Sequence, residues 1–250
     1  MDCSFTLLDI SADLVEQWRI AFEKHIPHIL GMKVITLQFK LADLSGPASQ
    51  FDCIVSPANS YGRLDGGHMI THYAFIPIDS FDFFLAEALA PAEELEAPTK
   101  LAQAALYRRW RGYAPPGSCT LVSLLNSSCA NNRHSCSYIA LCPTMRVPIN
   151  VEWDREIVYN CVWSLLVALD EHNRAVKTNG GVKISRVLMP GLATGIGGIS
   201  AEQCAQQMAL AFKHFEDALA HPQKWSALEW DDAIDYAEDV RATHRRRVGD

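Results

Sequence analysis

Short apolar runs rich in β-branched residues alternate along this chain with longer stretches whose apolar residues recur every three or four positions. This alternation predicts strands that lead into helices, and therefore one α/β sandwich. We expect strands at residues 5–8, 34–39, 51–55, 119–125, 137–141 and 182–189, and helices at residues 13–31, 80–112, 152–172, 200–219 and 226–240.

Local signals set several helix boundaries. Asp13 with Glu16, and Ser200 with Gln203, are spaced as capping boxes at helix starts. Gly31 is placed to end the first helix. Four tryptophans lie on helical apolar stripes and are expected in the core: Trp18, Trp153, Trp163 and Trp230.

The composition limits the class of protein. A chain of 250 residues corresponds to about one large domain, and 49% hydrophobic content fits a globular protein. The net charge of −7 gives no basic excess, so nucleic acid is not expected as a partner. The longest apolar stretch, residues 161–169, is far shorter than the ~20 residues of a membrane span. No membrane partner is expected, and the start of the chain has no secretory signal, so the expected location is cytoplasmic or nucleocytoplasmic.

The eight cysteines are expected to be ordinary reduced thiols, because most lie inside apolar runs. Cys129, His134, Cys136 and Cys142 are close in sequence, but their spacings match no paired C-x2-C pattern. A structural zinc remains the alternative interpretation of this cluster. We expect neither a metal nor a cofactor.

Two glycine-rich loops each follow an expected strand and precede an expected helix. The first covers residues 55–68 and the second residues 189–198. Ligands of α/β proteins bind at the carboxyl ends of strands, and the backbone N–H groups of such loops bind phosphate oxygens. The ordered pair could hold a diphosphate from both sides. The alternative is that these glycines only permit tight turns.

At these loops the sequence resembles the macrodomains, a family that binds ADP-ribose. Residues 52–60, D-C-I-V-S-P-A-N-S, are similar to the family's D-A-I-V-N-A-A-N-S strand and loop. Residues 41–45 resemble its G-D-I-T segment, and residues 190–198 its P-x-L-G-T-G-I-x-G loop. The V-S-P-A-N-S and D-G-G loop, with P-T-M-R-V-P at 143–148, resembles a less studied macro-like branch.

The resemblance covers residues 33–220 and implies a three-layer α/β/α sandwich with a mixed central sheet. We expect residues 1–225 to form this domain, with an irregular helical insertion at about 77–116. Residues 226–250 would add an amphipathic C-terminal helix and a basic tail. That tail is either solvated or in contact with nucleic acid or with the acidic face of the helix.

The family's roles carry over position by position. Asp43 and Leu44 would hold adenine, and Asn59 the distal ribose. Diphosphate and distal ribose would contact the loops, through Gly66, Gly67 and His68 in the first and Gly191, Thr194, Gly195, Ile196 and Gly197 in the second.

The catalytic arrangement departs from the family. Hydrolytic macrodomains of one class carry G-G-G-G-V-D, and Met69 stands here at the position of its aspartate. Asn59, Asp65 and His68 are therefore the candidate catalytic residues, with Asn59 orienting water and Asp65 or His68 assisting. His68 and His72 also have a spacing that can bind metal, but no third ligand is evident.

The expected function is binding of ADP-ribose, or of an ADP-ribosylated macromolecule, with hydrolysis at the distal ribose. The reaction would remove ADP-ribose from the macromolecule or dephosphorylate ADP-ribose 1″-phosphate. The alternatives are a non-catalytic reader of ADP-ribose and an interaction protein that retains the fold without the ligand. Arg146, in the P-T-M-R-V-P segment, is expected either to hold a carboxylate or phosphate or to form a structural ion pair.

Overall fold

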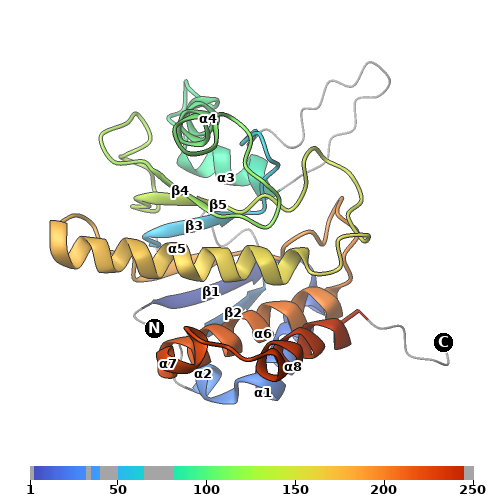
Figure 1. Cartoon of the computed structure of the whole chain (residues 1–250). Helices are drawn as coiled ribbons and strands as arrows, with labels where there is room; N and C mark the ends of the chain where they lie inside the picture. Colours follow the sequence, from blue (N-terminus) through green and yellow to red (C-terminus); the bar gives the residue numbers. More distant parts are fainter. Residues whose placement is uncertain (1–2, 32–34, 40–49, 65–80, 245–250) are drawn as a thin grey trace.

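The computed structural model of the chain describes residues 3–31, 35–39, 50–64 and 81–244 (Figure 1). Within these residues the strands form one six-stranded sheet of order β2-β1-β6-β3-β5-β4. The neighbouring strands pair in parallel except β4, which is antiparallel to β5. The strands are β1 (Ser4–Asp9), β2 (Ile35–Phe39), β3 (Cys53–Ser56), β4 (Thr120–Ser123), β5 (Tyr138–Leu141) and β6 (Arg186–Met189).

Helices cover both faces of this sheet. Figure 1 shows α3 and α4 on one side of the strands and α5 and α6 on the other. The three-layer α/β/α sandwich with a mixed sheet is thus confirmed. The helices are α1 (Ala12–His25), α2 (Pro27–Gly31), α3 (Phe81–Leu89), α4 (Ala97–Trp110), α5 (Ile157–Asn179), α6 (Ala201–Ala220), α7 (Pro222–Trp225) and α8 (Trp230–Ala242).

Alternation along the strands divides the core into two clusters. In β3, Val55 packs with α1, α5 and α6, whereas Ile54 points to the opposite face, toward α3 and α4. Both side chains are almost fully buried. Successive side chains of a strand point to opposite faces of a sheet, so apolar residues at consecutive positions require cover on both sides. This explains why β3 and β5 are apolar without interruption.

The start and the end of the first helix differ from the expectation. The N-cap is Ser11, whose hydroxyl accepts a hydrogen bond from the N–H of Leu14, so the capping box at Asp13 was wrong. The helix ends at His25 because Pro27 follows and begins the short α2, of which Gly31 is the last residue. A proline disfavours the helical conformation of the residue before it and can start a new helix.

The later boundaries also shift. Helix α5 begins at Ile157 and continues to Asn179, seven residues past the expected end, and β6 is only the second half of its expected strand. At α6, Ser200 accepts from the N–H of Gln203, as predicted for its cap. The Gln203 side chain instead donates to the carbonyl of Arg155, so the capping box is not reciprocal.

The C-terminal helix α8 lies alongside α6, away from the sheet (Figure 1). Of its expected apolar stripe, only Val240 is buried, while Trp230 is 80% exposed and Ile234 half exposed. The placement of Trp230 in the core was therefore wrong, and so was that of Trp153, which is 72% exposed. Trp18 is buried and Trp163 packs against the core.

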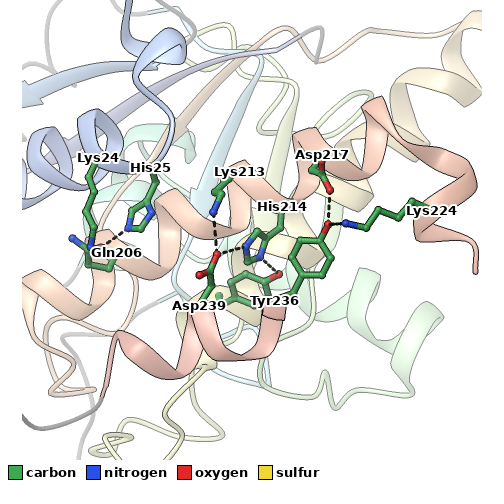
Figure 2. A network of polar contacts seen from close by, with 10 residues as sticks. Lys24, His25, Gln206, Lys213, His214, Asp217, Lys224, Tyr236 and Asp239 are labelled. Atoms are coloured by element: carbon green, nitrogen blue, oxygen red, sulfur yellow. Dashed lines mark hydrogen bonds and ion pairs between the residues drawn. The ribbon is translucent and has the colours of Figure 1, made fainter. Parts of the chain in front are cut away.

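Polar contacts join α8 to α6 instead (Figure 2). His214 of α6 is buried, with Tyr159 Oη 3.0 Å from its Nδ1 and Asp239 Oδ2 of α8 3.3 Å from its Nε2. Asp217 accepts hydrogen bonds from Tyr236 Oη at 2.6 Å and from Trp225 Nε1 at 2.8 Å. These donors, with His221, lower the pKa of Asp217 to about 2. The helix is thus held by hydrogen bonds and aromatic contacts more than by an apolar seam.

All eight cysteines lie in the described part of the chain. All eight thiols are free and buried. Cys129 and Cys136 belong to the core against α3 and α4, and Cys142 lies in the core on the other face. No helix in the described part of the chain is long and apolar enough to cross a membrane.

Candidate functional site

A cleft of about 370 Å³ opens at the carboxyl ends of the parallel strands. Asp9 ends β1, Pro57 follows β3, Thr144 follows β5 and Pro190 follows β6, and all four residues line it. Parallel strands present their following loops at one edge of the sheet, which is where α/β proteins bind ligands. The cleft lies at the edge of the sheet where the sequence predicts the site.

The loop between β6 and α6 carries unused hydrogen-bond donors. Its residues 194–197 all line the cleft, and none of their four backbone N–H groups has an acceptor among the described residues. Ala193, just before them, has a left-handed φ of 59°. The loop leads directly into the N-terminus of the 20-residue helix α6. Consecutive free N–H groups at a helix N-terminus form an anion-binding site.

The positions of this loop that carry glycine differ in why they require it. A Cβ on Gly197 would lie 2.5 Å from the carbonyl oxygen of Ala193, and a Cβ on Gly191 would lie 2.5 Å from Leu14. A Cβ on Gly195 would meet nothing within 4 Å, and its φ lies outside the left-handed region. Close packing explains the first two glycines, but no contact within the described chain explains Gly195. A glycine without a structural reason is typical where a ligand approaches the backbone.

Asn59 lines the cleft on the opposite side, at an isolated bridge with Met145. Its side chain mainly stabilises its own loop. Asn59 Nδ2 donates to the carbonyl of Arg63 at 2.8 Å, and Oδ1 accepts from the N–H of Tyr61 at 3.1 Å. An amide nitrogen has two hydrogens, so one remains to reach a ligand.

Thr144 supplies a buried hydroxyl at the cleft. The residue is 1% exposed, and its Oγ1 has no hydrogen-bond partner in the described part of the chain. Its backbone N–H donates to the carbonyl of Ala58, which fixes its position. Buried polar atoms are nearly always hydrogen-bonded. The hydroxyl is therefore available to a ligand.

Two carboxylates line the cleft and are held by neighbouring groups. Asp9 accepts from the N–H groups of Ser11 at 2.9 Å and Gly191 at 3.3 Å, which joins the end of β1 to the second loop. Asp82 accepts from the hydroxyl of Ser56 at 2.6 Å. No lysine or arginine lines this cleft in the described residues. An anion bound here would depend on backbone N–H groups, as in helix N-terminal sites.

The sequence-predicted site residues fall into two sets. The structure brings Asn59, Gly191, Thr194, Gly195, Ile196 and Gly197 together around one cleft. The others lie outside the described residues: Asp43, Leu44, Asp65, Gly66, Gly67 and His68. Met69 and His72 also lie there, and their interpretation stays as the sequence left it.

Of the two roles expected for Arg146, the structural ion pair finds no partner among the described residues, and the binding of a carboxylate or phosphate stays a prediction. Arg146 is exposed at the rim rather than in the cleft. Its guanidinium lies over the ring of Tyr113, 4.8 Å from the centroid, and its Nε donates to Tyr61 Oη at 3.3 Å. The residues of this segment that line the cleft are Thr144, Met145 and Pro148.

Sequence reasoning missed several lining residues. Asp9, Ile10 and Ser11 reach the cleft because β1 lies between β2 and β6, an order that no local pattern indicates. The strand followed by a Ser N-cap was a usable signal, since it marks a strand-to-helix junction. Phe81 and Asp82 enter from the start of α3.

The fold is thus that of an α/β/α protein with a cleft at the carboxyl edge of its mixed sheet, lined by N–H donors without an acceptor among the described residues. No family model matches the sequence, and no curated protein matches it.

Solved structures of macrodomains, the family that the motifs resemble, do match. The macrodomain of Oceanobacillus iheyensis with ADP is 16% identical, with a TM-score of 0.45 over 79% of this chain and 87% of that chain. A mutant of the same macrodomain with ADPR is 17% identical, with a TM-score of 0.43 over 68% and 73%. The form with MES bound is 15% identical, with a TM-score of 0.42 over 78% and 86%. The likeness is distant, and the proposals below rest on the residues of this chain.

Proposed function

We propose that this protein binds ADP-ribose, or a derivative of it, in the cleft at the carboxyl edge of the sheet. The observation that carries the proposal is the run of four N–H groups at residues 194–197, which have no acceptor among the described residues and lie in the loop that leads to α6. Such a run suits a diphosphate, because each phosphate oxygen can accept from more than one N–H. Residues 41–45, 52–60 and 190–198 resemble macrodomain motifs. This resemblance implies that the adenosine and the distal ribose would bind on either side of the diphosphate.

The cleft is also the place for chemistry at the distal ribose. With the diphosphate held by the second loop, water would attack the anomeric carbon. The bond to the macromolecule would break, and the departing oxygen would take a proton. Asn59 would orient the water and Asp65 or His68 would supply acid–base assistance. The same site would accept ADP-ribose 1″-phosphate, with phosphate as the leaving group.

Calorimetric titration with ADP-ribose, with AMP and NAD as comparators, tests the binding step. We expect saturable binding of ADP-ribose that is weakened by Asp43→Ala, through loss of the adenine contact. Gly195→Leu should weaken it as well without unfolding the loop, because a Cβ there meets no described residue within 4 Å. A folded wild type that does not bind ADP-ribose at millimolar concentration would contradict the proposal.

Hydrolysis is tested separately, by release of ADP-ribose from modified protein or nucleic acid and of phosphate from ADP-ribose 1″-phosphate. Turnover that falls in Asp65→Ala or His68→Ala, with binding retained, supports the catalytic assignment. Binding without turnover in the wild type would favour a non-catalytic reader of ADP-ribose. This reader is the second candidate function, because Met69 stands where hydrolytic macrodomains of one class have an aspartate.

A further inference from the structure

We propose that a basic and aromatic surface beside the cleft binds single-stranded nucleic acid, and that this strand is the macromolecule carrying the ADP-ribose. The second half of this statement rests on the function proposed above, whereas the first half does not. The surface consists of Tyr61, Tyr107, Arg108, Arg109, Trp110, Arg111, Tyr113 and Arg146. The overall charge of −7 argued against nucleic acid, but charge on a folded protein is distributed unevenly.

Three of its arginines lie against aromatic rings. The guanidinium carbon of Arg109 is 5.2 Å from the centroid of the Trp110 ring, and that of Arg111 is 5.7 Å from the Tyr107 ring. The third pair, Arg146 over Tyr113, joins two loops far apart in the sequence. Tyr61 closes the group, with its ring 5.9 Å from that of Tyr113.

These arginines are not neutralised within the described residues. The arginines that form ion pairs with described acidic side chains are Arg19, Arg174, Arg186 and Arg241. Arg108, Arg109, Arg111 and Arg146 are exposed and have no such partner. Cations near the end of a helix stabilise its dipole, which gives Arg108 and Arg109 a structural use. That reason does not extend to Arg146, which comes from the loop after β5.

The surface is continuous with the cleft. Asn59 and Met145 line the cleft, and Tyr61 and Arg146 follow them closely in the chain. The N–H of Ser60 donates to the carbonyl of Met145 at 3.0 Å, which holds the two loops together. Farther out, Trp110 Nε1 donates to Thr120 Oγ1 at 2.9 Å. Thr120 pairs with Leu141, the last residue of β5, so the end of α4 lies at the same edge of the sheet as the cleft.

A hollow extends the surface over the free edge of the sheet. Arg108 and Arg109 line it with Thr120, and its volume is about 560 Å³. Glu171 and His172 of α5 form its other wall, so it is basic on the α4 side only.

Exposed arginines beside the exposed rings of Tyr61 and Tyr107 fit single-stranded nucleic acid better than an acidic peptide. Unpaired bases stack on aromatic side chains and on guanidinium planes, while the phosphates bind the charges. Tyr107 is 62% exposed and so presents a ring to solvent. An acidic peptide would use the arginines but gain little from the rings. A duplex hides its bases and would gain only the phosphate contacts.

The test is fluorescence anisotropy with labelled, unmodified single-stranded DNA and RNA of about 15 nucleotides, a length near the upper site size of single-strand binders. We expect binding that weakens as salt rises. The triple variant Arg109→Ala/Arg111→Ala/Arg146→Ala should weaken it by at least about tenfold. Tyr107→Ala should weaken it less, and Tyr107→Phe should preserve it, because stacking needs the ring and not the hydroxyl.

The matched control is Arg19→Ala, which removes one exposed positive charge from α1 on the opposite face. Equal weakening by Arg19→Ala, no binding by the wild type, or competition by poly-glutamate as strong as by the unlabelled strand would each overturn the proposal. Gly195→Leu should leave binding of the unmodified strand unchanged. Strand binding without ADP-ribose binding would overturn the proposed function and support the nucleic-acid surface. ADP-ribose binding without strand binding would support the proposed function and overturn the nucleic-acid surface.

Discussion

At the scale of single residues, the hydroxyl of Thr144 is a destabilising group in the cleft when no ligand is bound. Its hydroxyl is buried without a described partner, and such a group costs about 1–3 kcal/mol relative to a paired one. Because Thr144 also lines the cleft, a hydrogen bond to a bound ligand best explains why a destabilising hydroxyl is present there. The same logic applies to Gly195, since no contact with another described residue requires a glycine there.

Thr144→Val should therefore separate stability from binding. Valine keeps the shape and removes the hydroxyl, so we expect the free energy of unfolding to stay equal or rise by about 1 kcal/mol. The affinity for ADP-ribose should fall about five- to tenfold, by loss of one hydrogen bond. Urea unfolding and calorimetry measure the two quantities. Thr178→Val, on the exposed end of α5, is the control and should change neither; unchanged affinity in Thr144→Val would remove the hydroxyl from the site.

At the scale of elements, the attachment of α8 to α6 depends on buried polar groups. Burial lowers the pKa of His214, while its hydrogen bond to Asp239 acts in the opposite direction and only partly offsets this. Burial also lowers the pKa of His25, the last residue of α1. Its Nε2 lies 2.6 Å from Oε1 of Gln206, near the start of α6 (Figure 2). Both histidines thus bind a proton less readily in the folded state than in the unfolded state.

These shifts fix the sign of the pH dependence. A histidine whose folded pKa lies below its unfolded value of about 6.5 binds fewer protons when folded. The contribution of the two histidines to the free energy of unfolding should therefore be complete above about pH 6.5. The free energy of unfolding should fall as the pH drops below this value. Urea unfolding across this range measures it. His214→Gln should flatten the dependence, whereas His172→Gln, at the partly exposed end of α5, should preserve it. A stability that rises on acidification through this range would contradict the assignment.

At the scale of the molecule, α8 supports the fold but does not line the cleft in the described residues. Deletion of residues 226–250 should lower the free energy of unfolding by roughly 3 kcal/mol or more. The deletion removes the buried Val240 and the Tyr236 ring, and Asp217 and His214 lose their partners on α8. ADP-ribose binding should survive at low temperature. Thermal unfolding and calorimetry test both, with deletion of residues 245–250 alone as the control. An unchanged melting temperature, or loss of ligand binding by a folded truncated chain, would contradict this view of the helix.

Local patterns predicted most elements, because they depend on nearby residues. The uninterrupted apolar runs identified β3 and β5 as buried strands, and the Ser200 cap located the start of α6. Helix ends were less predictable. Pro27 ended α1 before the glycine that the pattern favoured. For α8 the amphipathic pattern was real, but the face that packs was chosen by Tyr236, Asp239 and Val240, which find partners on α6.

The sequence by itself determined the α/β class, the positions of the strands and the glycine-rich loop at 191–197, since periodicity and turn chemistry are local properties. Only the tertiary structure decided the rest, because strand order is a matter of long-range pairing. It placed β1 beside β6 and so brought Asp9 to the cleft. It left the Thr144 hydroxyl buried without a partner among the described residues, and it stacked Arg146 on Tyr113. These pairings join residues tens of positions apart or more, where no sequence spacing reports the distance.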